Sequence, residues 1–146
     1  MFIGQYFYSL DDKGRLSLPV KFRESLGRGA VVTRGLDGCL TLYALDEWKT
    51  LAQKLATLPI NKSDGRAFSR FVLSGAMDVG MDRAGRIVIP EYLRVFAKIS
   101  KKTVVVGLYN KVEIWNEEAW TRYQSDNESS SSSIAEKLGD FSGTAI

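Results

Sequence analysis

The sequence contains no histidine, a single cysteine and only three prolines among its 146 residues. The absence of histidine excludes Ser-His and Cys-His catalysis, imidazole metal sites and the side chain that usually titrates near neutral pH. The lone thiol, Cys39, excludes an intrachain disulfide and a cysteine cluster for a metal. We therefore expect no metal and no other cofactor. Because Cys39 begins the strand-like stretch Cys39–Tyr43, we expect a small buried residue and not a reactive thiol.

Long apolar runs are also missing. No stretch approaches the ~18–20 residues of a membrane span, and the start, MFIGQYFYSL, lacks the basic segment and cleavage site of a signal peptide. We therefore expect a cytosolic protein. A chain that is 45% hydrophobic and 25% charged has the composition of a globular domain, and its length corresponds to about one domain.

The charge is unevenly distributed. The whole chain carries +3, and residues 124–146 hold four acids and one lysine, which leaves +6 on residues 1–123. A basic body suits an anionic partner such as nucleic acid, but many proteins without such a partner have the same balance.

A short motif occurs twice, 71 residues apart. The first copy is LDDKGRLSLP and the second is MDRAGRIVIP, so that Arg15 corresponds to Arg86. Both copies continue with alternating apolar residues, a proline and, eight residues after the motif arginine, a further arginine, Arg23 or Arg94. A repeat at a fixed offset indicates duplication of a structural unit.

The pattern around each copy predicts a strand, a turn, a second strand, a short helix beginning near a proline, two more strands and a longer helix. In the first half we place these at 2–10, 11–14, 15–18, 19–27, 31–33, 40–43 and from Asp46 to Pro59. In the second half we place them at 77–81, 82–85, 86–89, 90–97, 103–106, 112–115 and from Asn116 onward. Asp46 and Asn116 are the expected helix caps.

We therefore predict one domain over residues 1–123, made of two half-repeats (about 1–60 and 75–123) that share a barrel-like core. A helix near 64–73 joins them, with Ala67, Phe68, Phe71 and Val72 facing inward. Residues 124–146 are predicted to be a flexible tail because of the run Ser129–Ser133. Ile134, Leu138 and Phe141 are spaced for a short helix in this tail, which either docks or stays loose.

The duplicated turn is the candidate site. Gly14 and Gly85 allow a tight turn, after which Arg15 and Arg86 would project from the start of a strand. A two-stranded ribbon fits the major groove of DNA, where arginine bonds guanine O6 and N7. The remaining expected roles are orientation of the loops by Asp11 and Asp82 and phosphate contacts by Lys13 and Arg83.

A simpler interpretation is that each loop is only a turn with an exposed ion pair, worth about 0–1 kcal/mol. Three other candidates are weaker. Arg66 and Arg70 lie four residues apart and form either a phosphate contact or a solvated helix face. Residues 27–29 are too short for a phosphate loop. The aromatic residues of Gln5–Tyr8 are better explained by core and subunit contacts than by base stacking.

Longer stretches resemble a known family. These are the N-terminal pattern M-F-x-G-x-x-x-x-x-L-D-x-K-G-R-L-S-x-P, the segment FSRFVLSGAMDVGMDRAGRIVIP, and the segment VVVGLYNKVEIWNEEAW. They are similar to MraZ proteins over nearly all of 1–123, and the tail segment IAEKLGDF is similar to the family's final helix. The run Ser129–Ser133 departs from the family pattern.

The resemblance implies an α+β fold of the AbrB/MazE type, in which swapped-hairpin half-units form a double-split β-barrel with peripheral helices. It implies a bacterial, nucleoid-associated repressor of the division and cell-wall gene cluster, which forms closed rings and binds G-rich direct repeats. It also implies DNA contacts at Asp11–Arg15 and Asp82–Arg86. The expected partners are double-stranded DNA and further copies of the chain, with no membrane and no small-molecule substrate.

Two other function classes remain for the sequence. A binding module of the antitoxin type would sequester a protein partner, and residues 124–146 are the only candidate for its partner-wrapping arm. An enzyme is disfavoured, because without histidine we find no cluster of Asp, Glu, Lys, Tyr or Ser that suggests catalysis.

Overall fold

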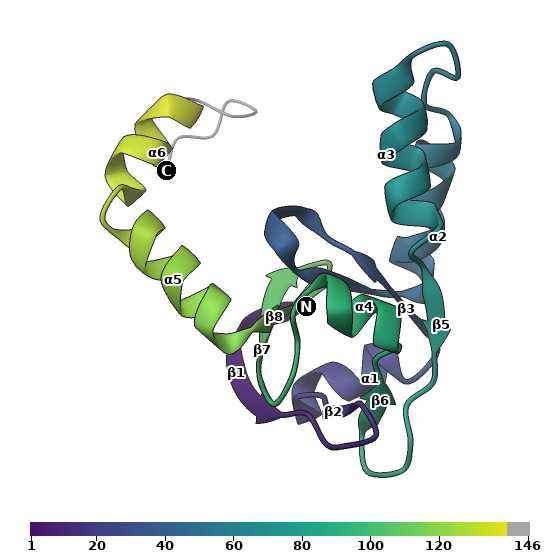
Figure 1. Ribbon diagram of the computed structural model, residues 1–146, viewed down its shortest axis with the longest axis vertical. Helices are drawn as coiled ribbons and strands as arrows, with labels where there is room; N and C mark the ends of the chain where they lie inside the picture. Colours follow the sequence, from purple (N-terminus) through teal and green to yellow (C-terminus); the bar gives the residue numbers. More distant parts are fainter. Residues whose placement is uncertain (140–146) are drawn as a thin grey trace.

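The computed structural model describes residues 1–139, which form a mixed α+β fold with antiparallel sheets (Figure 1). The strands are β1 (Phe2–Ser9), β2 (Arg15–Ser17), β3 (Ala30–Arg34), β4 (Leu40–Ala44), β5 (Met77–Val79), β6 (Arg86–Val88), β7 (Lys102–Tyr109) and β8 (Val112–Asn116). The α-helices are α1 (Arg23–Leu26), α2 (Leu45–Ala56), α3 (Ser63–Leu73), α4 (Glu91–Phe96), α5 (Glu117–Glu128) and α6 (Ser131–Leu138), and two 3-10 turns are η1 (Val20–Phe22) and η2 (Leu36–Gly38). Every strand and helix expected for the two half-repeats is present. Among residues 1–139, no helix combines the length and apolar character needed to cross a membrane.

The larger sheet shows the duplication directly. Its six strands run in the order β1-β7-β8-β4-β3-β5. In the two halves, β1, β3 and β4 correspond to β5, β7 and β8. If each strand is replaced by its counterpart, the same order results, read from the opposite edge of the sheet. The first strand of each half pairs with a strand of the other half, β1 with β7 and β5 with β3. Among residues 1–139, no ladder joins the edge strands β1 and β5, so the hydrogen-bonded sheet is open.

A separate two-stranded ribbon, β2–β6, carries both motif arginines. Its antiparallel register places Arg15 opposite Val88, Leu16 opposite Ile87, and Ser17 opposite Arg86. Leu16 and Ile87 point to the face that is fully buried in the core, because strand residues alternate between faces. Burial of each such side chain stabilises the fold by about 1.5–3 kcal/mol.

The short helices follow from the prolines that precede them. Pro19 lies before η1 and α1, and Pro90 is the N-cap residue of α4. Proline cannot donate a backbone hydrogen bond, and its fixed φ suits the start of a helix. The helices bury Phe22 and Leu26 in one half and Leu93 in the other.

The connecting helices differ from expectation at three positions. Asp46 lies in the first turn of α2, whereas the N-cap residue is Ala44 with no side-chain bond, because β4 continues directly into the helix. In α3, Val72 is buried as predicted, but Ala67 and Phe68 are exposed. Figure 1 shows the α2–α3 hairpin projecting from the sheet, so only the base of α3 reaches the core.

The C-terminal helices continue beyond the proposed domain boundary. Asn116 caps α5 as predicted, accepting a hydrogen bond from the Ala119 amide at 2.9 Å. Residue 123 falls inside α5, and α6 includes three residues of the serine run, Ser131–Ser133. Phe141, the last member of the predicted apolar stripe, lies outside the described residues.

Cys39 is buried, as predicted. It is 0% exposed and packs in a small cluster with Val104, Val106 and Trp115. Burial raises the pKa of its thiol well above the ordinary value, and nearby Glu113 adds to the effect. The thiol is therefore protonated and a poor nucleophile.

Candidate nucleic-acid interface

The first loop is organised by the carboxylate of Asp11. Its Oδ1 accepts hydrogen bonds from the backbone amides of Lys13 at 3.0 Å and Arg15 at 2.8 Å. Its Oδ2 accepts a hydrogen bond from Nε of Arg15. One side chain thus closes the turn and holds the arginine that follows it.

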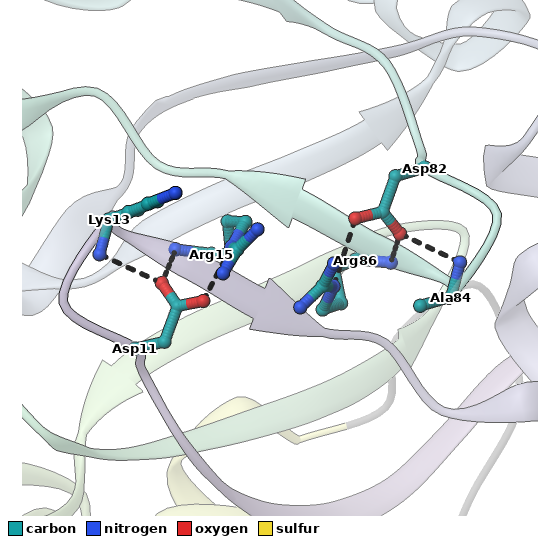
Figure 2. A network of polar contacts seen from close by, with 6 residues as sticks. All are labelled: Asp11, Lys13, Arg15, Asp82, Ala84 and Arg86. Carbon is teal, nitrogen blue, oxygen red and sulfur yellow. Dashed lines mark hydrogen bonds and ion pairs between the residues drawn. The ribbon is translucent and has the colours of Figure 1, made fainter.

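The second loop repeats this arrangement bond for bond (Figure 2). Oδ1 of Asp82 accepts from the amides of Ala84 and Arg86, both at 2.9 Å, and Oδ2 accepts from Nε of Arg86 at 2.9 Å. The backbone amides favour the ionised carboxylates, so the pKa values of Asp11 and Asp82 lie below the ordinary value, with the amides of Arg15 and Arg86 as the largest causes.

Each loop needs its glycine. Gly14 has a φ of 76° and Gly85 a φ of 78°, in the left-handed region that residues with a Cβ rarely adopt. Each glycine amide donates to the carbonyl of the loop aspartate at 3.0 Å. The tight turn and the aspartate cap are therefore parts of one local structure.

The two halves hold each other's loops. The Gly14 carbonyl accepts a hydrogen bond from the amide of Ile89 at 2.8 Å, and the Gly85 carbonyl accepts one from the amide of Leu18 at 2.9 Å. The loop of one half is thereby fixed to the strand end of the other. Loop position depends on both halves being folded together.

The ribbon brings the two arginines together. Because Ser17 is opposite Arg86 and shares a face with Arg15, both arginines belong to the same face and lie diagonally across the ladder. Figure 2 shows their side chains next to each other, between the two aspartates. The sequence predicted a separate turn before each arginine and did not indicate this proximity.

Both arginines reach solvent. The side chain of each is 33% exposed, although its Nε is paired with an aspartate. Within residues 1–139, the outer Nη atoms of Arg15 and Arg86 make no hydrogen bond. Each guanidinium therefore keeps two nitrogen atoms with free donors, held in orientation by its aspartate. Lys13 and Arg83 are exposed within the same loops.

Two of the weaker candidates make internal contacts. Arg66 donates from Nη1 to the Ile60 carbonyl at 2.8 Å, on the hairpin that projects away from the ribbon. Gln5 accepts a hydrogen bond from Trp120 Nε1 at 2.7 Å, and the Tyr6 ring packs edge-on against Phe22 at 5.4 Å. Among the described residues, no group of three or more acidic, histidine or cysteine side chains is arranged to hold a metal.

Comparison with known proteins agrees with the duplication. The profile of the family described as "MraZ protein, putative antitoxin-like" matches twice, over residues 1–71 and 72–142. The protein named "Transcriptional regulator MraZ" from Natranaerobius thermophilus is 50% identical over 141 residues, covering 97% of this chain and 99% of the relative. The proteins of that name from Caldanaerobacter subterraneus subsp. tengcongensis and Pediococcus pentosaceus are 49% and 48% identical, with the same coverage of both chains.

These matches confirm the family expected from the sequence, and the names of the relatives describe regulators and not enzymes. The boundary between the two profile matches lies between the two half-repeats. The symmetric strand order of the larger sheet relates the same two half-repeats. The chain therefore belongs to the MraZ family.

Proposed function

We propose that this protein is a sequence-specific, DNA-binding transcriptional repressor that reads guanine with Arg15 and Arg86. The observation that carries the proposal is the presentation of two aspartate-held guanidinium groups on one face of a single ribbon, with outer nitrogens free to donate. A carboxylate-oriented guanidinium is suited to the paired O6 and N7 acceptors of guanine in the major groove.

The exposed loop cations supply the non-specific part of binding. Lys13 and Arg83 lie within the turns, beside the residues that would face the bases. Contacts to phosphates position a protein on DNA without reading its sequence. The proposed division of roles is therefore base reading by Arg15 and Arg86, phosphate contact by Lys13 and Arg83, and loop orientation by Asp11, Gly14, Asp82 and Gly85.

We propose further that several copies form a closed ring on G-rich direct repeats upstream of the division and cell-wall gene cluster, on the nucleoid. Exposed apolar side chains on the edge strand β1 and its neighbour β7 support an interface between copies: Ile3 is 57%, Phe7 56% and Leu108 41% exposed. A head-to-tail interface whose rotation closes gives a ring. Ribbons that repeat in one orientation suit direct repeats spaced by one helical turn, about 10 bp.

In fold terms, the proposed architecture is a double-split barrel built from swapped hairpins. The exchange of β1 and β5 between halves and the mutual fixing of the loops support this description. The six-stranded sheet leaves one side of this barrel open, and the ribbon β2–β6 would close that side.

A second candidate function is capture of a protein partner, as in an antitoxin. It is favoured by helices α5 and α6, which extend away from the sheet in Figure 1 and expose Tyr123, Ile134 and Leu138. Removing residues 129–146 tests it, since partner capture would be lost and DNA binding would remain.

A mobility-shift titration with the DNA upstream of the protein's own gene, at two salt concentrations, tests the main proposal. We expect retarded complexes that outlast competition by a scrambled duplex of equal length and become weaker at the higher salt concentration. Equal binding to both duplexes would contradict sequence-specific recognition.

A further inference from the structure

A second pair of arginines repeats with the motif but was given no role above. Arg23 begins α1 and Arg94 lies in α4, each eight residues after the motif arginine of its own half. Their guanidinium groups cross to the loop of the other half. A Cβ added to Gly85 would overlap Nε of Arg23, and one added to Gly14 would lie 3.1 Å from Cζ of Arg94.

We infer that Arg23 and Arg94 are additional DNA-phosphate contacts, each supplied by one half-repeat to the loop of the other. The inference rests on the proposed function, because it assigns two further residues to the same DNA-binding surface. It differs from that proposal in the residues concerned and in their role, which is independent of base sequence.

Neither arginine has an internal anionic partner. Both are half-buried, and no carboxylate lies within 4.0 Å of either guanidinium within residues 1–139. Glu24, the sequence neighbour of Arg23, instead pairs with Arg28 at 3.6 Å. A cation that is partly removed from water without a counter-charge is unfavourable, and an external anion would relieve that cost.

The hydrogen bonds within residues 1–139 leave most of their donors free. Arg23 uses only Nε, which donates to the Leu18 carbonyl at 2.9 Å. Nε of Arg94 is buried with no acceptor. Covering a glycine does not require a guanidinium, because an aliphatic residue would do so without unpaired donors. Nε of Arg23 also satisfies the Leu18 carbonyl, but within residues 1–139 the Nη atoms of Arg23 and the side-chain donors of Arg94 have no internal acceptor. The use of arginine in both halves therefore points to its charge.

Their location groups three cations at each loop. Gly85 lies between Arg83 and Arg86, so Arg23 joins these two. In the same way, Arg94 lies over Gly14, between Lys13 and Arg15. Phosphates flank every base edge in the major groove, so a guanidinium beside the base-reading arginine is placed for the backbone and not for the base.

The test uses Arg23→Met and Arg94→Met, which keep an aliphatic cover on the glycine but remove the charge, and Arg23→Lys, which restores a charge. Arg122→Met is the matched control, because Arg122 lies on α5 and pairs with Glu118 at 3.3 Å. Fluorescence anisotropy measures affinity for the upstream duplex and a scrambled duplex over a salt series. Thermal unfolding of each variant is measured alongside.

We expect each Met variant to bind both duplexes roughly three- to tenfold more weakly and to lower the log–log salt slope by about 0.9, the value for one lost phosphate contact on duplex DNA. Arg23→Lys should keep the slope. The inference is overturned if the Met variants keep the slope of the Arg122→Met control, even if their affinity falls, because that result describes positioning alone.

Arginine modification of the wild-type protein by phenylglyoxal decides the matter if the Met variants do not fold. We expect DNA to protect Arg23 and Arg94, but not Arg122, in the mass spectrum; equal modification with and without DNA would overturn the inference. If the wild-type protein does not bind DNA at all, the proposed function itself has failed. If it binds and depends on Arg15 and Arg86 but not on Arg23 and Arg94, only this inference has failed.

Discussion

Arg86 lies diagonally across the β2–β6 ribbon from Arg15, displaced by two residues from the position directly opposite it. Diagonal neighbours on one face of an antiparallel pair are about 7–8 Å apart, within reach of a common ligand for long side chains. The duplication therefore places both copies of the motif on one surface and makes them a single candidate site. The aspartates on either side keep the two like charges pointing outward.

The loop cations should act without regard to base sequence. Lys13→Ala and Arg83→Ala are each expected to weaken binding to specific and scrambled duplexes equally, and to reduce the salt slope by roughly one ion. Anisotropy titrations over a salt series measure both effects. A change in the ratio of the affinities for the specific and scrambled duplexes would show that these side chains also read bases.

The loop aspartates should affect specificity and non-specific binding in opposite directions. Asp11→Asn removes a negative charge from the proposed DNA-facing surface and replaces an acceptor for Nε of Arg15. We expect binding to scrambled DNA to strengthen. We also expect the free-energy preference for guanine to fall, but by less than a full bidentate contact contributes, which is about 1–3 kcal/mol. Asp82→Asn should behave in the same way, and loss of both kinds of binding would contradict the assigned role.

The same carboxylates give a defined response to acid. Their pKa values are lower in the folded protein than in the unfolded chain. Their stabilising contribution is therefore complete above the ordinary aspartate pKa, about 3.9, and is lost as the pH falls through the lower folded values. We expect the loops to stay intact at neutral and mildly acidic pH. Denaturant unfolding in acid should show a smaller pH dependence for Asp11→Asn/Asp82→Asn than for the wild-type protein.

Substitution of each loop glycine by alanine should destabilise the protein, by a different amount at Gly14 and at Gly85. Gly85→Ala and Gly14→Ala share the strain of a positive φ, of order 1–3 kcal/mol. The added Cβ would overlap the Arg23 side chain in the first, whereas in the second it would lie 3.1 Å from both Cζ of Arg94 and the Ile89 carbonyl oxygen. Gly38→Ala isolates the backbone term, because Gly38 has a φ of 81° and no atom within 4 Å of an added Cβ. Urea unfolding should rank Gly85→Ala as the most destabilised. A Gly85→Ala midpoint equal to that of Gly38→Ala would contradict the close approach of Arg23.

The only thiol should be unreactive in the folded protein. Cys39 is fully buried, and burial raises the pKa of its thiol, so the thiolate that reacts with alkylating agents is scarce. Iodoacetamide at mildly alkaline pH should leave the native protein unlabelled and label it completely in denaturant. Rapid labelling of the native protein would contradict the packing of Cys39 against Trp115.

Local chemistry explains what could be predicted from the sequence. The turn glycines, the prolines before the short helices and the Asn116 cap act within a few residues, so their effects are visible in the sequence. Alternating apolar residues after Arg15 and Arg86 correctly indicated strands, and Leu16 and Ile87 in these strands are buried. The duplication itself is a sequence property, and the two profile matches agree with it.

Features that depend on pairing between the halves could not be predicted. The ladder that makes Arg15 and Arg86 neighbours, and the crossing of Arg23 and Arg94 to the opposite loops, join residues far apart in the chain. The helical spacing of α3 likewise could not show that the hairpin projects from the core and leaves Phe68 exposed. DNA contact by the loops stays a prediction.

The most direct measurement of the central claim is the affinity of Arg15→Ala, Arg86→Ala and the double variant for the upstream duplex and for a duplex in which guanines of its repeats are replaced. Arg28→Ala serves as a control, because Arg28 is exposed and paired with Glu24 outside the loops. Each single variant should lose about 1–3 kcal/mol of DNA-binding free energy per engaged loop and discriminate less between the duplexes. The double variant should retain mainly salt-sensitive, non-specific binding. Unchanged affinity and guanine preference in Arg15→Ala and Arg86→Ala would contradict the account.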